Sequence, residues 1–98
     1  MILVRDIFQV KFGRMKEAKE VWKEMLKTFP GQAQGRPRLL TDLTGQYYTL
    51  VLESTHKDLS DYETFSQKEM SAPGIGALYQ KLVPLVDSGR REIFTIVE

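Results

Sequence analysis

The 98 residues suffice for one domain with a single modest core, and we expect residues 1–98 to form that one domain. Fourteen basic residues nearly balance thirteen acidic ones, so the net charge of +1 gives no strong field that would favour nucleic acid or an anionic membrane. The chain has no cysteine, which excludes disulfides and thiolate metal sites.

The hydrophobic periods along the chain alternate between those of strands and those of helices. Their order is strand, helix, strand, strand, helix, strand, which is typical of a ferredoxin-like βαββαβ fold of the α+β class. The expected elements are a strand at Met1–Phe12, a helix at Met15–Phe29, a hairpin of Arg38–Leu43 and Tyr47–Ser54, a helix in two pieces at Asp58–Val86, and a closing strand at Arg91–Val97.

Short connections join these elements. Gly13 and Gly45 are suited to tight turns, because glycine accepts the positive φ that other residues resist. Thr55, Asp58 and Ser60 are three alternative N-caps for the second helix. The sequence further predicts helix termination at Pro30-Gly31, a flexible stretch at Gln32–Pro37 and a turn at Asp87-Ser88-Gly89.

The predicted topology places the first and third strands at the centre of the sheet, and we expect them to be parallel, with both helices on one face. Alternation assigns one set of side chains to the core beneath the helices, with a bulge near Ile7–Phe8. This core set is Ile2, Val4, Phe8, Val10, Phe12, Tyr48, Leu50 and Leu52. The opposite set is Leu3, Arg5, Ile7, Gln9, Lys11, Tyr47, Thr49, Val51, Glu53, Ile93, Thr95 and Val97.

The opposite face mixes apolar and ionisable groups, and no predicted helix remains to cover it. Monomeric proteins rarely expose a large apolar patch, and a second copy related by twofold symmetry would cover this one. We therefore expect a homodimer in which two sheets face each other as a barrel, with polar residues lining an interior pocket.

Spacings along the whole chain resemble those of the dimeric α+β barrel proteins, and within them the NIPSNAP-like family. The resemblance lies in Arg5 leading an alternating strand into Gly13, an amphipathic helix, the Leu40–Gly45 hairpin, the Leu52–Ser54 strand end that feeds helix Asp58–Lys68, and the segment Ser88–Ile93. The resemblance implies a homodimer with a ligand-sized cavity. We expect no cofactor.

Five residues of the open face are candidate ligand-binding residues: Arg5, Gln9, Tyr47, Thr49 and Glu53. In the expected register, Arg5 lies level with Tyr47 or Thr49, where its guanidinium would bind a carboxylate or polarised carbonyl. Glu53 would act as a base if burial raised its pKa. The alternative is that Arg5 and Glu53 form interface ion pairs.

Lys11 and His56 are weaker candidates. Lys11 is expected level with Glu53, with a solvated strand end as the alternative. His56 follows the third strand, where a single histidine is most often a solvated turn or cap residue. It has no second ligand nearby in the sequence, so we expect no metal site. Trp22 lies within the apolar stripe of the first helix and is assigned to the core.

Other ferredoxin-like functions lack their residues here. RNA-recognition domains need a basic, glycine-containing aromatic motif on the third strand, and Gly45–Leu50 does not supply one. Arg5 and Asp6 interrupt the apolar N-terminus and no apolar run approaches bilayer length, so we expect no secretion signal, no membrane partner and a cytoplasmic location.

The sequence therefore predicts a small homodimer that binds a small organic molecule in its barrel, or transforms it without a cofactor as a monooxygenase does. The alternative is a non-enzymatic structural or regulatory dimerisation module with a filled interior.

Overall fold

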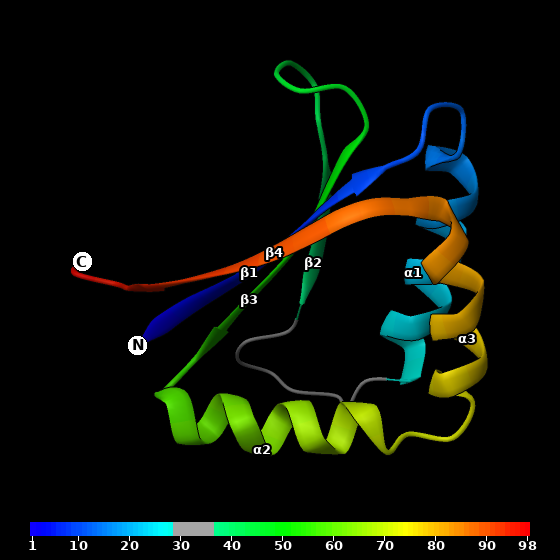
Figure 1. Cartoon of the computed structure of the whole chain (residues 1–98). Coiled ribbons are helices and arrows are strands. Elements are labelled where there is room, and N and C mark those ends of the chain that lie inside the picture. Colours follow the sequence, from blue (N-terminus) through cyan, green and yellow to red (C-terminus); the bar gives the residue numbers. More distant parts are fainter. Residues whose placement is uncertain (29–36) are drawn as a thin grey trace.

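The computed structural model describes residues 1–28 and 37–98 as one layer of helices against one sheet (Figure 1). The elements in chain order are β1 (Ile2–Val10), α1 (Met15–Thr28), β2 (Arg38–Thr41), β3 (Thr49–His56), α2 (Leu59–Met70), α3 (Ile75–Leu82), a short 3₁₀ turn (Val83–Leu85) and β4 (Val86–Thr95). This order confirms the ferredoxin-like α+β prediction. The expected end of the first helix at Phe29 and Pro30-Gly31, and all of the stretch Gln32–Pro37 except Pro37, lie outside the described residues.

The four strands form one sheet in the order β2-β3-β1-β4, with β1 and β3 at its centre as predicted. The prediction that these two central strands are parallel is wrong, because β1 pairs antiparallel with β3 and with β4. The chain crosses from β1 to β2 through α1 and then reverses through a hairpin into β3. That reversal makes β3 run opposite to β1.

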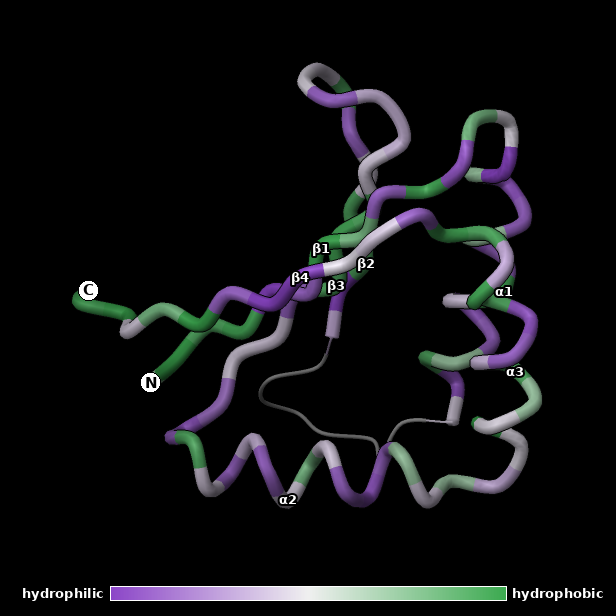
Figure 2. Tube along the Cα trace, viewed as in Figure 1, coloured by the Kyte–Doolittle hydropathy of each residue, from purple (hydrophilic) through white to green (hydrophobic). Residues whose placement is uncertain are grey.

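The core lies between the sheet and the helices. Leu50, Val4 and Val10 are the largest fully buried side chains of the sheet. Leu50 and Val10 pack in one core with Trp22 and Met25 of α1. Trp22 is only 4% exposed, which confirms its assignment to the core. Figure 2 shows strongly hydrophobic residues gathered along the strands.

Phe12 is a correction to the expected core set. It is 76% exposed because β1 ends at Val10, so the chain has already left the sheet when it reaches Phe12. Its ring instead packs against Tyr48, with ring centroids 4.8 Å apart. Tyr48 adopts a φ of 60° beside the glycine turn at Gly45, where φ is 116° as the turn prediction requires.

The last strand starts five residues earlier than predicted, at Val86 rather than Arg91. Asp87, Ser88 and Gly89 therefore belong to β4 and do not form the predicted turn. The irregularity in the pairing falls between Gln9 and Val10, not near Ile7–Phe8. Pairing along the whole of β1 supplies the hydrogen bonds that override the turn-like composition of this segment.

The register of β4 on β1 reverses the expected facing of its residues. Ile93 pairs with Val4 and so shares the helix side, whereas Phe94 pairs with Leu3 on the opposite side. The residues of β4 on the open face are therefore Ser88, Arg90, Glu92 and Phe94, and not the predicted Ile93 and Thr95.

Asp58 is the N-cap of α2, one of the three alternatives given by the sequence. Its Oδ1 accepts a hydrogen bond from the backbone N–H of Asp61 at 2.8 Å. Gly74 separates α2 from α3 with a φ of 82°. Among the described residues, no helix has both the length and the apolar composition needed to cross a bilayer.

Candidate functional site

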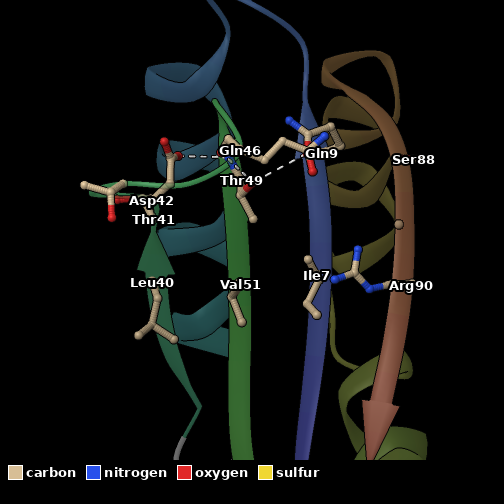
Figure 3. Close-up of a pocket in the computed structure, with 12 residues that line it drawn as sticks. Ile7, Gln9, Leu40, Thr41, Asp42, Gln46, Thr49, Val51, Ser88 and Arg90 are labelled. Carbon is tan, nitrogen blue, oxygen red and sulfur yellow. Dashed lines mark hydrogen bonds between the residues drawn. The ribbon is translucent and has the colours of Figure 1, made fainter.

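The face of the sheet opposite the helices carries four rows of side chains. Because residues paired across strands point to the same side, each row is set by the strand register. The first three rows are Arg38–Glu53–Arg5–Glu92, Leu40–Val51–Ile7–Arg90, and Thr49–Gln9–Ser88, and the fourth is Thr55–Leu3–Phe94. Figure 3 looks onto this open face, and the helices lie behind the sheet.

A cavity of about 410 Å³ lies over the second and third rows. Apolar side chains of Ile7, Leu40 and Val51 form one part of it, and polar groups from the hairpin and from β4 form the other. In Figure 3 the side chain of Arg90 extends across the sheet toward Ile7. The cavity thus combines an apolar floor with a guanidinium at its side.

The polar end of the cavity is held by hydrogen bonds to the hairpin. The backbone N–H of Thr49 donates to Oδ1 of Asp42 at 2.9 Å, and its hydroxyl donates to the carbonyl of Gln46 at 2.9 Å. Nε2 of Gln9 donates to the carbonyl of Tyr48 at 3.3 Å and also bonds the carbonyl of Tyr47. These bonds fix the side chains before any ligand arrives.

Of the predicted candidates, Gln9 and Thr49 line this cavity. Arg5 and Glu53 lie one row away, where Nε of Arg5 is 3.3 Å from Oε2 of Glu53. The register expected from the sequence placed Arg5 opposite Tyr47 or Thr49, and Lys11 opposite Glu53. That register is wrong, because it assumed parallel central strands. An ion pair between Arg5 and Glu53 is present, and it forms within one chain.

Glu53 is the centre of a larger ionic cluster. Arg38 of β2 donates to its Oε1 from Nε at 3.1 Å and from the terminal nitrogen at 2.5 Å. The side chain of Glu53 is only 12% exposed, and two guanidinium groups neutralise it from both flanking strands. Both carboxylate oxygens of Glu53 are therefore engaged by guanidinium groups, which is unsuited to a base.

Tyr47 and Lys11 lie outside the cavity. Tyr47 is 72% exposed because β3 begins only at Thr49, and its side chain belongs to the hairpin. Lys11 follows the last residue of β1, and its side chain is exposed. Whether either residue contacts a ligand stays a prediction.

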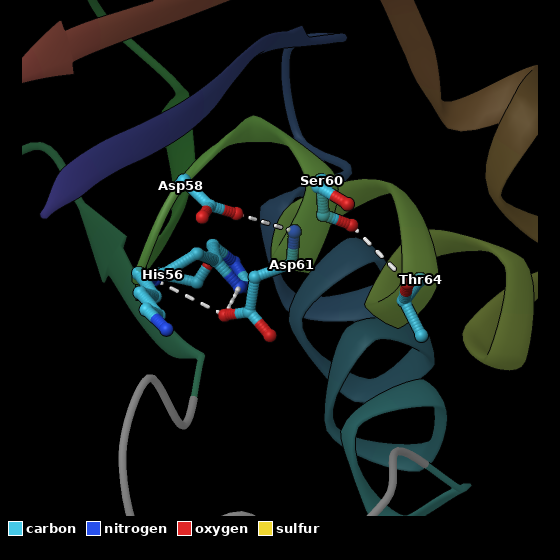
Figure 4. Close-up of polar contacts among 7 residues, drawn as sticks. His56, Asp58, Ser60, Asp61 and Thr64 are labelled. Atoms are coloured by element: carbon cyan, nitrogen blue, oxygen red, sulfur yellow. Dashed lines mark hydrogen bonds and ion pairs between the residues drawn. The ribbon is translucent and has the colours of Figure 1, made fainter.

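His56 is buried at the end of β3, at 5% exposure, so its assignment as a solvated turn or cap residue is wrong. Its Nε2 shares a hydrogen bond of 2.9 Å with the hydroxyl of Ser54. Its Nδ1 lies 3.9 Å from Oδ2 of Asp61, as Figure 4 shows for the two side chains. Burial lowers the pKa of His56, and the Asp61 carboxylate partly offsets that effect. The three residues do not form a catalytic triad, since 3.9 Å is too long for a hydrogen bond and Ser54 is buried.

Sequence reasoning missed Asp42, Leu40 and Arg90 as cavity residues. Leu40 and Arg90 are placed by their pairing with the central strands, and Asp42 by its bond to Thr49. The signal in the sequence was the register of the hairpin around Gly45, which would have placed Leu40 beside Val51.

In comparisons with known proteins, no family model and no curated protein matches the chain. Solved structures do match over almost the full length. A NIPSNAP domain protein from Burkholderia xenovorans superposes with a TM-score of 0.83 at 14% identity, covering 99% of this chain and 95% of that chain. The chain has the fold of NIPSNAP domain proteins. This finding confirms the resemblance inferred from the sequence.

Two further solved structures share the NIPSNAP fold of this chain. A NIPSNAP family protein of unknown function from Agrobacterium tumefaciens has a TM-score of 0.80 at 16% identity, over 96% of this chain and 86% of that chain. SnoaB, a cofactor-independent oxygenase from Streptomyces nogalater, has a TM-score of 0.68 at 18% identity, over 99% of this chain and 93% of that chain. At these identities the likeness concerns the fold alone.

Proposed function

We propose that the protein is a homodimer that binds a small organic molecule between its two open sheet faces. The observation that carries this proposal is the cavity of about 410 Å³ on that face, a volume within the range of small-molecule sites. A cytoplasmic location is part of this proposal and stays a prediction.

The apolar row Leu40–Val51–Ile7 supports the dimer. Ile7 is buried in the single chain, whereas Val51 is half-buried and Leu40 is exposed. A second copy related by a twofold axis would lay the same row against this one and remove it from water. The charged row around Glu53 would then lie beside the apolar contact and fix its register.

The lining indicates which molecules would bind. Arg90 offers donors to a carboxylate or a carbonyl, and the apolar row offers a surface for a ring. Gln9 and Thr49 are held by their bonds to the hairpin, so they would set the depth to which a ligand enters. We therefore propose an aromatic or aliphatic molecule with one carboxylate or carbonyl group.

Cofactor-free oxygenation is a further part of the proposal, supported by the shared fold with an oxygenase described as cofactor-independent. The competing function is a dimerisation module without a ligand. It is favoured by the fact that Gln9, Asp42 and Thr49 already bond to protein groups.

Benzoate and thermal unfolding test the binding proposal. We expect benzoate to raise the melting temperature of the wild type, because a ligand that binds only the native state stabilises it. Arg90→Met should remove most of that rise, and Arg14→Met, which changes an exposed arginine paired with Glu17 on α1, should not. If neither benzoate nor benzamide alters the melting temperature, the dimerisation module is the better interpretation.

A further inference from the structure

A second cavity, of about 430 Å³, lies at the edge of the sheet between β4 and α3. We call it the α3 groove. Its walls are mostly apolar: Phe8, Tyr79, Leu82, Val83 and Val86. Four charged residues also line it: Asp6, Asp87, Arg90 and Arg91. The α3 groove takes Phe8 from the helix side of β1, whereas the first cavity takes Ile7 and Gln9 from the opposite side.

Asp6 and Arg91 form a cross-strand ion pair in this groove. They are partners in the β1–β4 register, and Nε of Arg91 donates to Oδ1 of Asp6 at 2.5 Å. That bond raises the pKa of Arg91, so the guanidinium stays charged. The two terminal amino groups of a guanidinium are further donors, and the carboxylate has further acceptor sites.

Two groups of α2 face this ion pair. The guanidinium of Arg91 lies 5.4 Å from the ring centre of Tyr62, and the carboxyl of Glu69 interacts with both Asp6 and Arg91. Burial and the Asp6 carboxylate raise the pKa of Glu69 to about 7. Burial also raises the pKa of Tyr62, whose hydroxyl is bonded to Ser66. Tyr62 therefore stays neutral at ordinary pH.

The charges near the groove determine which ligand suits it. When Glu69 is ionised, the three carboxylates of Asp6, Asp87 and Glu69 carry one more negative charge than Arg90 and Arg91 neutralise. A ligand carboxylate would then meet an excess of protein carboxylates, and like charges repel strongly at partly buried sites. A neutral hydroxyl avoids that repulsion, because it donates one hydrogen bond to a carboxylate and accepts one from a guanidinium.

We propose that the α3 groove is a second binding site, for a small aromatic molecule that carries a hydroxyl group. The ring lies against Phe8, Leu82 and Val83, and the hydroxyl donates to Asp6 and accepts from Arg91. No chemical step is needed at this site. The site is complete within one chain, so it does not depend on the dimer, and it shares only Ser88, Gly89 and Arg90 of β4 with the open-face cavity.

The single tryptophan reports occupancy of the groove. Trp22 packs against Phe8, with ring centroids 5.4 Å apart, and Phe8 lines the groove. The protein contains one tryptophan, so its indole N–H gives one identifiable signal in a proton–nitrogen NMR spectrum. A ligand in the groove shifts that signal, and one on the open face leaves it in place.

The probes are 4-chlorophenol, 4-chloroanisole and 4-chlorobenzoate, titrated at about pH 8, where Glu69 is mostly ionised. We expect 4-chlorophenol to shift the Trp22 indole signal and to bind at least tenfold more tightly than the other two, or about 1.4 kcal/mol. Equal binding of the methyl ether would overturn the proposal, since the ether cannot donate a hydrogen bond. So would an unmoved indole signal at saturation.

Two variants test where 4-chlorophenol binds and which charge disfavours 4-chlorobenzoate. Val83→Phe fills the groove from its half-exposed rim and should weaken 4-chlorophenol at least fivefold, whereas Leu40→Ala on the open face should not. Glu69→Gln should reduce the preference for 4-chlorophenol over 4-chlorobenzoate at least fivefold, and Glu63→Gln, at an exposed site on α2, should leave it unchanged. An unchanged affinity in Val83→Phe would overturn the proposal whatever the Glu69 variant does.

Discussion

Arg5 of β1 and Glu53 of β3 form a cross-strand ion pair, with 3.3 Å between Nε and Oε2. Arg38 of β2 binds the other oxygen of the same carboxylate. One largely buried carboxylate therefore connects three neighbouring strands on the open face. Such a shared, partly desolvated group contributes more than an exposed ion pair, because both guanidinium groups lose a partner when it is removed.

Glu53→Gln tests this cluster, since it keeps the shape of the side chain and removes its charge. We expect the free energy of unfolding to fall by about 1–3 kcal/mol, measured by urea denaturation at one fixed protein concentration. The matched control is Glu24→Gln, which changes an exposed glutamate paired with Lys27 on α1 and should cost less than about 0.5 kcal/mol. Equal losses in the two variants would show that the cluster is only a surface feature.

Val51→Glu tests the proposed dimer. Val51 lies at the centre of the apolar row, and a glutamate there would place an unpaired charge in the interface, weakening association by several kcal/mol, roughly 2–4. Sedimentation equilibrium at micromolar concentration should give twice 11.3 kDa for the wild type and the single mass for the variant.

Val83→Glu is the control for the dimer, because Val83 is half-exposed beside α3, away from the open face. It should remain dimeric. A wild-type chain that sediments as a monomer at every concentration would remove the basis of the proposed dimer.

Trp22→Ala tests the core between α1 and the sheet. Truncation of a buried tryptophan leaves a cavity beside Phe8 and should cost about 3–5 kcal/mol of stability. The wild-type fluorescence should be blue-shifted and move to the red on unfolding. Emission already typical of indole in water would contradict the burial of Trp22.

The fold was predictable because apolar periodicity directly reflects which side of each element is buried. The apolar stripe of α1 placed Trp22 in the core. The alternation around Leu50 placed one side of the third strand against the same core. Strand direction is different, since it depends on how the chain crosses and reverses rather than on any local period. The wrong direction for β1 and β3 moved every predicted cross-strand neighbour and separated Arg5 from its actual partner, Glu53.

The candidate site was predictable only in part for the same reason. Gln9 and Thr49 have strand periodicity, so alternation placed both on the open face. Arg90 follows the turn-like residues Ser88 and Gly89, and only pairing with β1 makes that segment a strand. The glutamate near the α3 groove, Glu69, looks like an ordinary helix-surface residue in the sequence, because its partners Asp6 and Arg91 are far away along the chain.

His56 should make the protein less stable in mild acid. Burial lowers its pKa in the folded state, so below the ordinary value of about 6.5 the unfolded chain binds more protons than the folded one. Unfolding free energy should therefore fall as the pH falls from about 6.5 through the folded pKa. His56→Gln should remove part of that fall, as measured by urea denaturation at several pH values. A wild type and variant with parallel pH profiles would contradict this assignment.

Glu69 should change the stability in the opposite direction, between about pH 4.5 and pH 7. Its pKa is raised from 4.5 to about 7 in the folded state, so between these values the folded protein holds a proton that the unfolded chain has lost. The contribution of protonated Glu69 to the free energy of unfolding is complete below pH 4.5 and is lost as the pH rises toward 7. Glu69→Gln mimics the protonated form, and it should be more stable than the wild type above pH 7 by about 1–2 kcal/mol, because partial exposure to water reduces the full effect.

The control for Glu69 is Glu63→Gln on the same helix, at an exposed position. Its stability difference from the wild type should not change with pH across this range. Urea denaturation of all three proteins at about pH 5 and pH 8 supplies the measurement. A gain in Glu69→Gln that is the same at both values would show that the carboxyl is already ionised at pH 5, which would contradict the raised pKa of Glu69.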